Sequence, residues 1–201
     1  AMGFEHAVRS QGRSQAVRSL VLQARTPQLV LAISSRALPH YRTPQDLRRC
    51  KIGVNAWGGL AHAMAQRVLE HAGVQEVGFV VVGDGAQAVA ALRAGKVQAL
   101  CHGDPAMARL ERNRELRVVY DTRSLAGAQA VFGGSLPGSC LAALPQFLQT
   151  YPARAQSLAD GVVHALKWLQ TAAPADIVKV IPAESLTGDR RLFLAALDRV
   201  R

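Results

Sequence analysis

Apolar runs that alternate with helix-like segments most strongly limit what this chain can fold into. Runs typical of buried strands occur at 51–55, 77–83, 97–101 and 116–121. Helical patterns fill the intervals at 60–72, 86–95 and 105–113, and a glycine follows each of the first two. This alternation indicates right-handed βαβ units and a mostly parallel sheet, which is an α/β fold.

The flanking segments are less regular. A short helix is expected at 3–12, and "SLVLQA" (19–24) and "QLVLAIS" (28–34) are typical of strands. A polar, proline-bearing connector at 34–47 marks a lobe boundary. Beyond Asp121 we expect strands at 128–134 and 139–144, a short helix from Pro145, and helices at 152–172, 174–180 and 189–200.

Composition narrows the function. The net charge is +10, and residues 1–51 carry nine Lys or Arg against only Glu5 and Asp46. A basic face attracts anions, but the basic residues are scattered and no nucleic-acid motif accompanies them, so nucleic acid is not the expected partner. The three cysteines lack metal-ligand or disulfide spacing, so neither a metal nor a cofactor is expected. No transmembrane run and no signal peptide are visible in the sequence.

Three strand-to-helix turns share one position in the pattern, each after a predicted strand. They are Ala56-Trp57-Gly58-Gly59, Gly83-Asp84-Gly85-Ala86-Gln87 and Gly103-Asp104-Pro105. In an open α/β sheet such turns lie at the carboxyl ends of the strands, where ligands bind. Their glycines and free backbone N–H groups would suit a small anion. The pattern predicts an anion cradle built from Trp57, Gly58, Gly59, Asp84, Gly85, Gln87 and Asp104.

A purely structural interpretation fits the same residues. Asp84 and Asp104 are good N-caps, and Gly58 with Gly59 would form a tight turn in any protein. Trp57 could be a core residue or the wall of a cleft. His62 is more often a surface or satisfied histidine than a ligand contact. Both interpretations stay open at this point.

Catalysis is not expected. Cys101 and His102 are neighbours on a predicted strand, so their side chains point to opposite faces. No nucleophile motif, metalloprotease motif, phosphate loop or complete dinucleotide fingerprint occurs.

The stretch from Asp46 to Asp121 resembles a known family. "DLRRCKIGVNAWGGLAHAMAQRVLEHAGV" and "VVVGDGAQAVAALRAGKVQALCHGDPAMARLE" are similar to the periplasmic substrate-binding proteins of ABC importers for nitrate, sulfonates and taurine. That group also holds the thiamine-pyrimidine-precursor proteins. The chain departs from the family pattern at Arg49, where a glycine is usual, and at Gln98, where an aspartate is usual.

The resemblance implies a periplasmic-binding-protein type II fold with two lobes of mixed, mostly parallel sheet and flanking helices. Residues 1–45 would be part of lobe 1, 46–122 a complete lobe 2, and 123–201 a return to lobe 1 with C-terminal helices. It also implies that the solute binds between lobes that close about a hinge. Phe4 and Glu5 would then lie on a lobe 1 cleft loop, facing the turns of lobe 2.

The same resemblance implies function and partners. The chain would be a periplasmic solute-binding component for a small anionic or sulfonate-type solute, with a membrane permease as partner. Lobe 1 lacks the strands and helices that open it in the family. We therefore expect weakened solute binding, open edges on strands such as 28–34, and self-association that covers them. A thiamine-pyrimidine-precursor binding or synthesis protein and the ligand-sensing domain of a regulator remain the alternatives.

Overall fold

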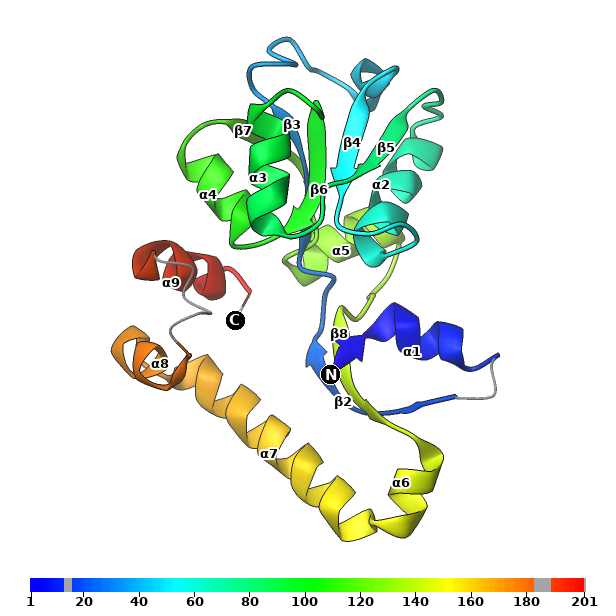
Figure 1. The fold of residues 1–201 in the computed structure, drawn as a ribbon, viewed down its shortest axis with the longest axis vertical. Helices are drawn as coiled ribbons and strands as arrows, with labels where there is room; N and C mark the ends of the chain where they lie inside the picture. The colour runs from blue at the N-terminus through cyan, green and yellow to red at the C-terminus, as the bar shows by residue number, and fades with distance from the viewer. Residues whose placement is uncertain (13–15, 183–188, 201) are drawn as a thin grey trace. The chain divides into compact units, whose positions relative to one another are not determined.

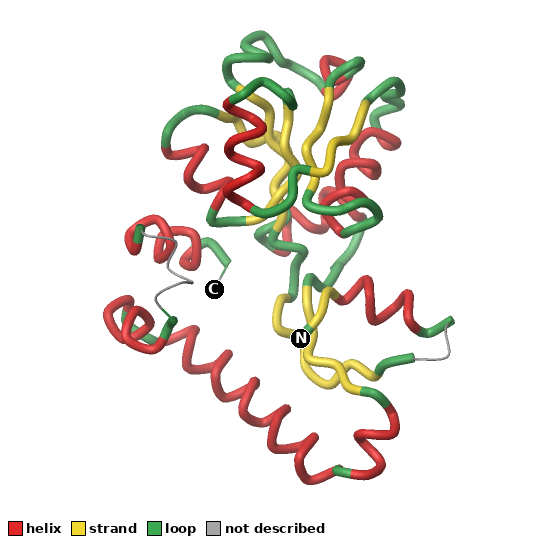
Figure 2. Tube along the Cα trace, in the orientation of Figure 1, coloured by secondary structure: helices red, strands yellow, loops and turns green. Residues whose placement is uncertain are grey.

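A computed structural model describes residues 1–12, 16–182 and 189–200. The chain forms two compact units (Figure 1). Unit 1 comprises residues 1–27 and 136–199, and unit 2 comprises residues 28–135. Each unit has its own sheet (Figure 2). Within the described ranges, no helix is both long enough and apolar enough to cross a membrane.

Unit 2 is built on a five-stranded sheet of order β5-β4-β6-β3-β7. Its strands are β3 (Leu29–Ser34), β4 (Lys51–Val54), β5 (Gly78–Val81), β6 (Ala99–Gly103) and β7 (Leu116–Asp121). Strand β4 pairs in parallel with β5 and β6, whereas β3 lies antiparallel between β6 and β7. The predicted βαβ units and mixed sheet are confirmed.

Helices cover both faces of this sheet. They are η1 (Pro44–Leu47), α2 (Leu60–His71), α3 (Gly85–Arg93), α4 (Ala106–Arg112) and α5 (Leu125–Phe132). Because side chains alternate along β3, Leu31 and Ile33 pack with α2 and α5, while Val30 and Ala32 pack with α3 and α4. The sheet therefore has a buried core on each side, which holds its strand ends in place.

Unit 1 contains a three-stranded sheet of order β1-β8-β2. Its strands are β1 (Met2–Gly3), β2 (Arg18–Ala24) and β8 (Ser139–Ala143), and both ladders are antiparallel. The helices are α1 (Phe4–Ser10), α6 (Pro145–Thr150), α7 (Pro152–Thr171), α8 (Pro174–Val180) and α9 (Arg190–Asp198). The mostly parallel pattern expected for both lobes thus applies to unit 2 alone.

The predicted lobe limits need correction. Strand β3 has hydrogen-bonded neighbours on both sides and is almost wholly buried, so residues 28–45 belong with the larger sheet. The first boundary falls at Pro27, not at 45, and the second falls at Ser135, not at 122. For the same reason, the expectation that the 28–34 strand would have open edges is wrong.

One predicted strand is a helix. Residues 125–132 form α5, which overlaps the segment 128–134 where the pattern predicts a strand. The side chain of Ser124 caps the helix by accepting from Gly127 N–H, and Gly133 ends it in the left-handed region at φ 74°. Ala128 and Val131 are buried three residues apart, which is the helical period. Because most residues of this segment are apolar, the helical spacing of the buried ones does not stand out in the sequence.

Candidate functional site

The carboxyl edge of the five-stranded sheet carries the predicted turns. Because β4 runs parallel to β5 and β6, the turns that follow these strands leave the sheet at the same edge. Trp57, Asp84 and Asp104 therefore lie at one edge of unit 2. The three turns nevertheless differ in what satisfies their backbone N–H groups.

The turn before α2 has no capping side chain. Gly59 is the N-cap residue, and no side chain accepts a hydrogen bond from the first turn of the helix. Gly58 adopts φ 67°, a left-handed conformation that favours glycine. Within the described residues, no side-chain cap therefore offsets the positive end of this twelve-residue helix.

His62 lies under this turn. Its side chain is nine-tenths buried, and its Nδ1 accepts a hydrogen bond from the N–H of Gly58 at 3.2 Å. The ring packs edge-to-face against Trp57 and Phe79, with centroid distances of 4.9 and 4.6 Å. Nε2 of His62 is buried and has no hydrogen-bond partner among the residues that the structure describes. A buried polar atom without a partner is unfavourable unless a ligand or water completes it.

Trp57 forms the exposed wall of the same cluster. It is 63% exposed, although its ring packs against His62. Trp57 is therefore not a core residue, and its role as the wall of a cleft stays a prediction.

The turn before α3 is closed by its own side chain. The Oδ1 of Asp84 accepts hydrogen bonds from the N–H groups of Ala86 and Gln87, both at 3.0 Å. Gly85 is needed for packing, because a Cβ there would lie 3.1 Å from Ala106. The Gln87 side chain folds back against Gly83. Capping thus occupies the amides that were predicted to hold an anion.

The third turn ends in an ion cluster. Asp104 Oδ1 accepts from the N–H of Ala108 at 2.8 Å, and its Oδ2 lies 3.2 Å from the buried guanidinium of Arg123. Arg123 also pairs with Asp121 at 2.6 Å and lies 3.8 Å from a Glu111 oxygen. Burial alone would lower the pKa of Arg123, but the hydrogen bond from Arg123 to Asp121 and the charges of Asp104 and Asp121 raise it. The Asp104 carboxylate therefore takes part in a helix cap and in an ion pair within the protein.

Phe4 and Glu5 belong to unit 1. They begin α1 directly after β1, so the loop predicted there is a strand followed by a helix. The N–H of Phe4 donates to the Gly138 carbonyl at 3.1 Å. Oε2 of Glu5 is buried and has no hydrogen-bond partner.

Sequence reasoning missed Arg123 and undervalued His62. His62 follows Gly58 by four residues, one helical turn, and that spacing could have suggested the contact. Arg123 gave no such signal, because its partners come from three separate segments. The thiol of Cys101 is buried, and burial raises its pKa, so it lacks the character of a nucleophile. Among the described residues, no group of three potential ligands could hold a metal ion.

A mixed α/β sheet with helix N-termini at its carboxyl edge defines the class of the chain, the periplasmic-binding-protein type II architecture. The model of the NMT1-like family matches residues 9–182, so the chain belongs to the NMT1-like family. No curated protein matches the sequence.

Solved structures agree on the fold. A protein from Bordetella bronchiseptica RB50 is 36% identical, with a TM-score of 0.88 over 98% of this chain and 63% of its own. The periplasmic aliphatic sulphonate binding protein SsuA from Escherichia coli is 18% identical, with a TM-score of 0.76 over 98% of this chain and 64% of its own. The alkanesulfonate-binding protein SsuA from Xanthomonas axonopodis pv. citri, bound to MOPS, is 17% identical, with a TM-score of 0.71 over 96% and 63%. The chain spans less than two thirds of each.

Proposed function

We propose that the chain is a solute-binding component of an ABC importer, and that unit 2 takes a small anionic, sulfonate-type solute at the N-terminus of α2. The observation that carries this proposal is the buried Nε2 of His62, which has no partner and lies in the first turn of an uncapped helix.

The chemistry of this end of α2 suits an oxyanion. Since Nδ1 of His62 accepts from Gly58, the neutral ring carries its proton on Nε2 and can only donate there. The uncapped helix end supplies backbone N–H donors and a partial positive charge. A sulfonate presents several acceptor oxygens, so it can use both kinds of donor at once.

The exposed ring of Trp57 would contact the part of such a solute that carries the sulfonate group. An alkyl chain attached to the sulfonate would pack against it and leave water. Asp84, Gly85, Gln87 and Asp104 would shape the edge, because the Asp84 and Asp104 carboxylates already accept from the N–H groups of Ala86, Gln87 and Ala108. Phe4 and Glu5 stay predicted contacts from unit 1.

The wider assignment follows from the family and the fold. The E. coli SsuA is described as periplasmic and a related SsuA as part of a sulfonate ABC transporter, and this supports a periplasmic location for the chain and a membrane permease as its partner. No enzymatic activity is proposed.

Calorimetric and NMR titrations test the proposal. Ethanesulfonate, taurine, MOPS and nitrate are titrated into the chain, and the Trp57 indole N–H signal is followed. We expect saturable shifts with dissociation constants of about 1 mM, which corresponds to ~4 kcal/mol of binding free energy.

His62→Phe keeps a ring in the cluster but removes both nitrogens, and should weaken binding at least about tenfold. His71→Phe makes the same change at the far end of α2 and should bind normally. Equal affinity in both variants would exclude this site.

A pyrimidine is a second candidate solute, and the same titration tests it. The flat, exposed ring of Trp57 offers a stacking surface for a pyrimidine, the ligand type of the precursor proteins that the chain resembles. If an aminopyrimidine saturates the Trp57 signal while sulfonates do not, the solute class is pyrimidine and the anionic assignment is wrong. A ligand-sensing role in a regulator has no observation in its favour.

We also propose that the chain self-associates through unit 1. Most of its exposed large apolar side chains lie there, including Leu22 at 44%, Leu144 at 48% and Leu158 at 52% exposed. Strand β2 is an edge strand of its sheet and offers unpaired backbone groups. Sedimentation velocity should show a concentration-dependent dimer or larger species, and a monomer at all concentrations would contradict this proposal.

A further inference from the structure

The edge of the five-stranded sheet opposite the candidate solute site is strongly basic. Ser34 pairs with Leu116, Ile33 with Ala99, and Lys51 with Gly78, so one end of β3 and the starts of the other strands form this edge. The loops there span residues 34–51, 72–78, 93–98 and 112–117. They carry ten basic and three acidic residues.

All ten basic side chains belong to exposed residues, and we call this surface the basic edge. Its basic members are Arg36, Arg42, Arg48, Arg49, Lys51, Arg93, Lys96, Arg112, Arg114 and Arg117. The three carboxylates neutralise only part of this charge. Glu115 accepts two hydrogen bonds from Arg93, Glu76 pairs with Arg49, and Asp46 accepts from backbone N–H groups.

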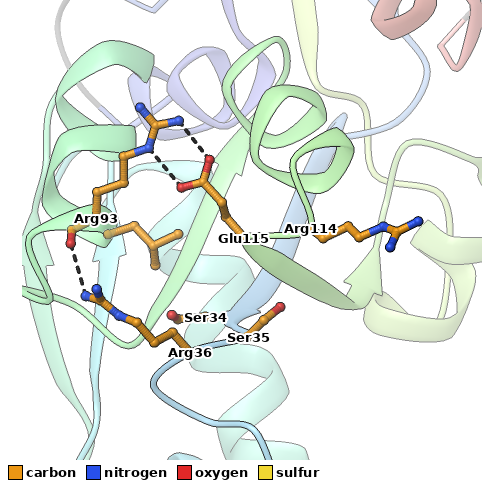
Figure 3. Close-up of a pocket in the computed structure, with 7 residues that line it drawn as sticks. Ser34, Ser35, Arg36, Arg93, Arg114 and Glu115 are labelled. Carbon is orange, nitrogen blue, oxygen red and sulfur yellow. Dashed lines mark hydrogen bonds and ion pairs between the residues drawn. The ribbon is translucent and has the colours of Figure 1, made fainter.

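A pocket of about 410 Å³ opens in this edge between β3, α3 and the turn before β7. Ser34, Ser35, Arg36, Arg93, Arg114 and Glu115 line it, and the Glu115 carboxylate lies beside the Arg93 guanidinium (Figure 3). Arg36 donates to the Arg93 carbonyl at 3.1 Å, which holds its guanidinium at the pocket (Figure 3). The side chain of Arg114 extends away from the Arg36–Arg93 contact (Figure 3). The pocket thus combines hydroxyl groups with guanidinium groups, and Arg93 offsets the one carboxylate that lines it, so the remaining cation suits one phosphate group.

The shape of the basic edge distinguishes between anionic partners. Five neighbouring strands at about 4.8 Å spacing spread the charges over a width of roughly 20 Å, as a row of loops. Readout of the major groove of a duplex uses a helix or a two-stranded ribbon, whereas the helix within the described loops of this edge is the four-residue η1. The aromatic ring at the edge, Tyr41, is buried and lies under Arg117, so it offers no stacking surface for bases. A broad array of cations fits a broad anionic surface.

We propose that the basic edge docks unit 2 onto the surface of a bilayer that contains anionic phospholipids. The pocket beside Arg36 takes one headgroup phosphate, and the surrounding cations lie over neighbouring headgroups. Each Lys or Arg near such a surface strengthens binding about fivefold, and the attraction is screened by salt. The carboxyl edge with the α2 turn then faces away from the bilayer. This inference does not depend on the solute proposal.

Vesicle co-sedimentation of the full chain tests the proposal. Vesicles with about one third phosphatidylglycerol in phosphatidylcholine should bind the chain, pure phosphatidylcholine should not, and high salt should release it. The triple variant Arg48→Gln, Lys96→Gln, Arg114→Gln should lower the partition coefficient about 100-fold. The control triple Arg25→Gln, Arg67→Gln, Lys167→Gln changes the net charge equally outside the basic edge, and should alter partitioning less than about threefold.

Each other outcome overturns the proposal. Equal losses in both triples would mean that the overall charge of the chain, and not this edge, drives binding. Complete release by millimolar inorganic phosphate at constant ionic strength would identify a site for soluble phosphate. Edge-dependent binding to duplex DNA without vesicle binding would identify a nucleic-acid surface. Circular dichroism and urea unfolding check that both triples are folded.

Discussion

The N–H of Gly58 donates to Nδ1 of His62 across 3.2 Å, so the first turn of α2 fixes which ring nitrogen carries the proton. The ring is held edge-on between Trp57 and Phe79, and its second nitrogen remains the unpaired atom of the cluster. A glycine turn thus determines the hydrogen-bonding character of a buried histidine.

This relationship predicts the tautomer of His62. A histidine-selective ¹⁵N spectrum near neutral pH should show Nε2 protonated and Nδ1 unprotonated. In the ¹⁵N spectrum, an anionic solute should shift the Nε2 signal more than the Nδ1 signal. A proton on Nδ1 would rule out the hydrogen bond from Gly58.

Asp84 should act as a cap. Asp84→Ala removes the acceptor of the Ala86 and Gln87 N–H groups and should lower the free energy of unfolding by about 1 kcal/mol. Asp84→Asn keeps a side-chain oxygen and should lower the free energy of unfolding by about 0.3 kcal/mol at most. Urea unfolding of the three proteins makes the comparison, and equal stability of Asp84→Ala and the wild type would contradict the capping role.

Arg123 should be the most sensitive charge in unit 2. Arg123→Met leaves Asp104 and Asp121 without their buried cation and should cost about 3 kcal/mol. Asp104→Asn keeps the Arg123–Asp121 pair. Urea unfolding should therefore show a smaller decrease in the free energy of unfolding for Asp104→Asn than for Arg123→Met. If Arg123→Met and the wild type have the same urea midpoint of unfolding, the ion cluster contributes no net stability.

Stability should fall in acid partly through Glu115. Hydrogen bonds from Arg93 lower the pKa of Glu115 to about 2. A carboxyl with a depressed folded-state pKa stabilises the protein above its unfolded pKa, near 4.3, and this contribution is lost as pH falls toward 2. The stability gap between the wild type and Glu115→Gln should therefore narrow across that range. Glu76→Gln, which breaks a more exposed pair, should show little change, and a constant gap for Glu115→Gln would refute the linkage.

Two glycines in helices should respond oppositely to alanine. A Cβ at Gly127 would lie 1.8 Å from the Asp121 carbonyl oxygen, so Gly127→Ala must displace α5 and should destabilise by several kcal/mol. Gly161 in α7 has open space around it, and Gly161→Ala should stabilise by about 0.5–1 kcal/mol. Thermal denaturation compares the two, and a stable Gly127→Ala would show that α5 adjusts at little cost.

Local patterns determined much of this fold. The alternation of strands and helices from 51 to 121, the glycine after α2 and the prolines that begin α6, α7 and α8 follow from residue periods and capping chemistry, which depend on neighbours in sequence. The gathering of the Trp57, Asp84 and Asp104 turns at one edge follows from the same pattern, because parallel strands share their direction.

Tertiary structure decided the rest. The sequence could not show that β3 inserts between β6 and β7, because pairing partners are chosen by long-range packing of its two apolar faces. Nor could it show which turn lacks a capping side chain, since Asp84 caps one turn and Asp104, which also pairs with Arg123, caps another. His62 in α2 packs against Phe79 in β5, so only the folded chain brings the two rings together.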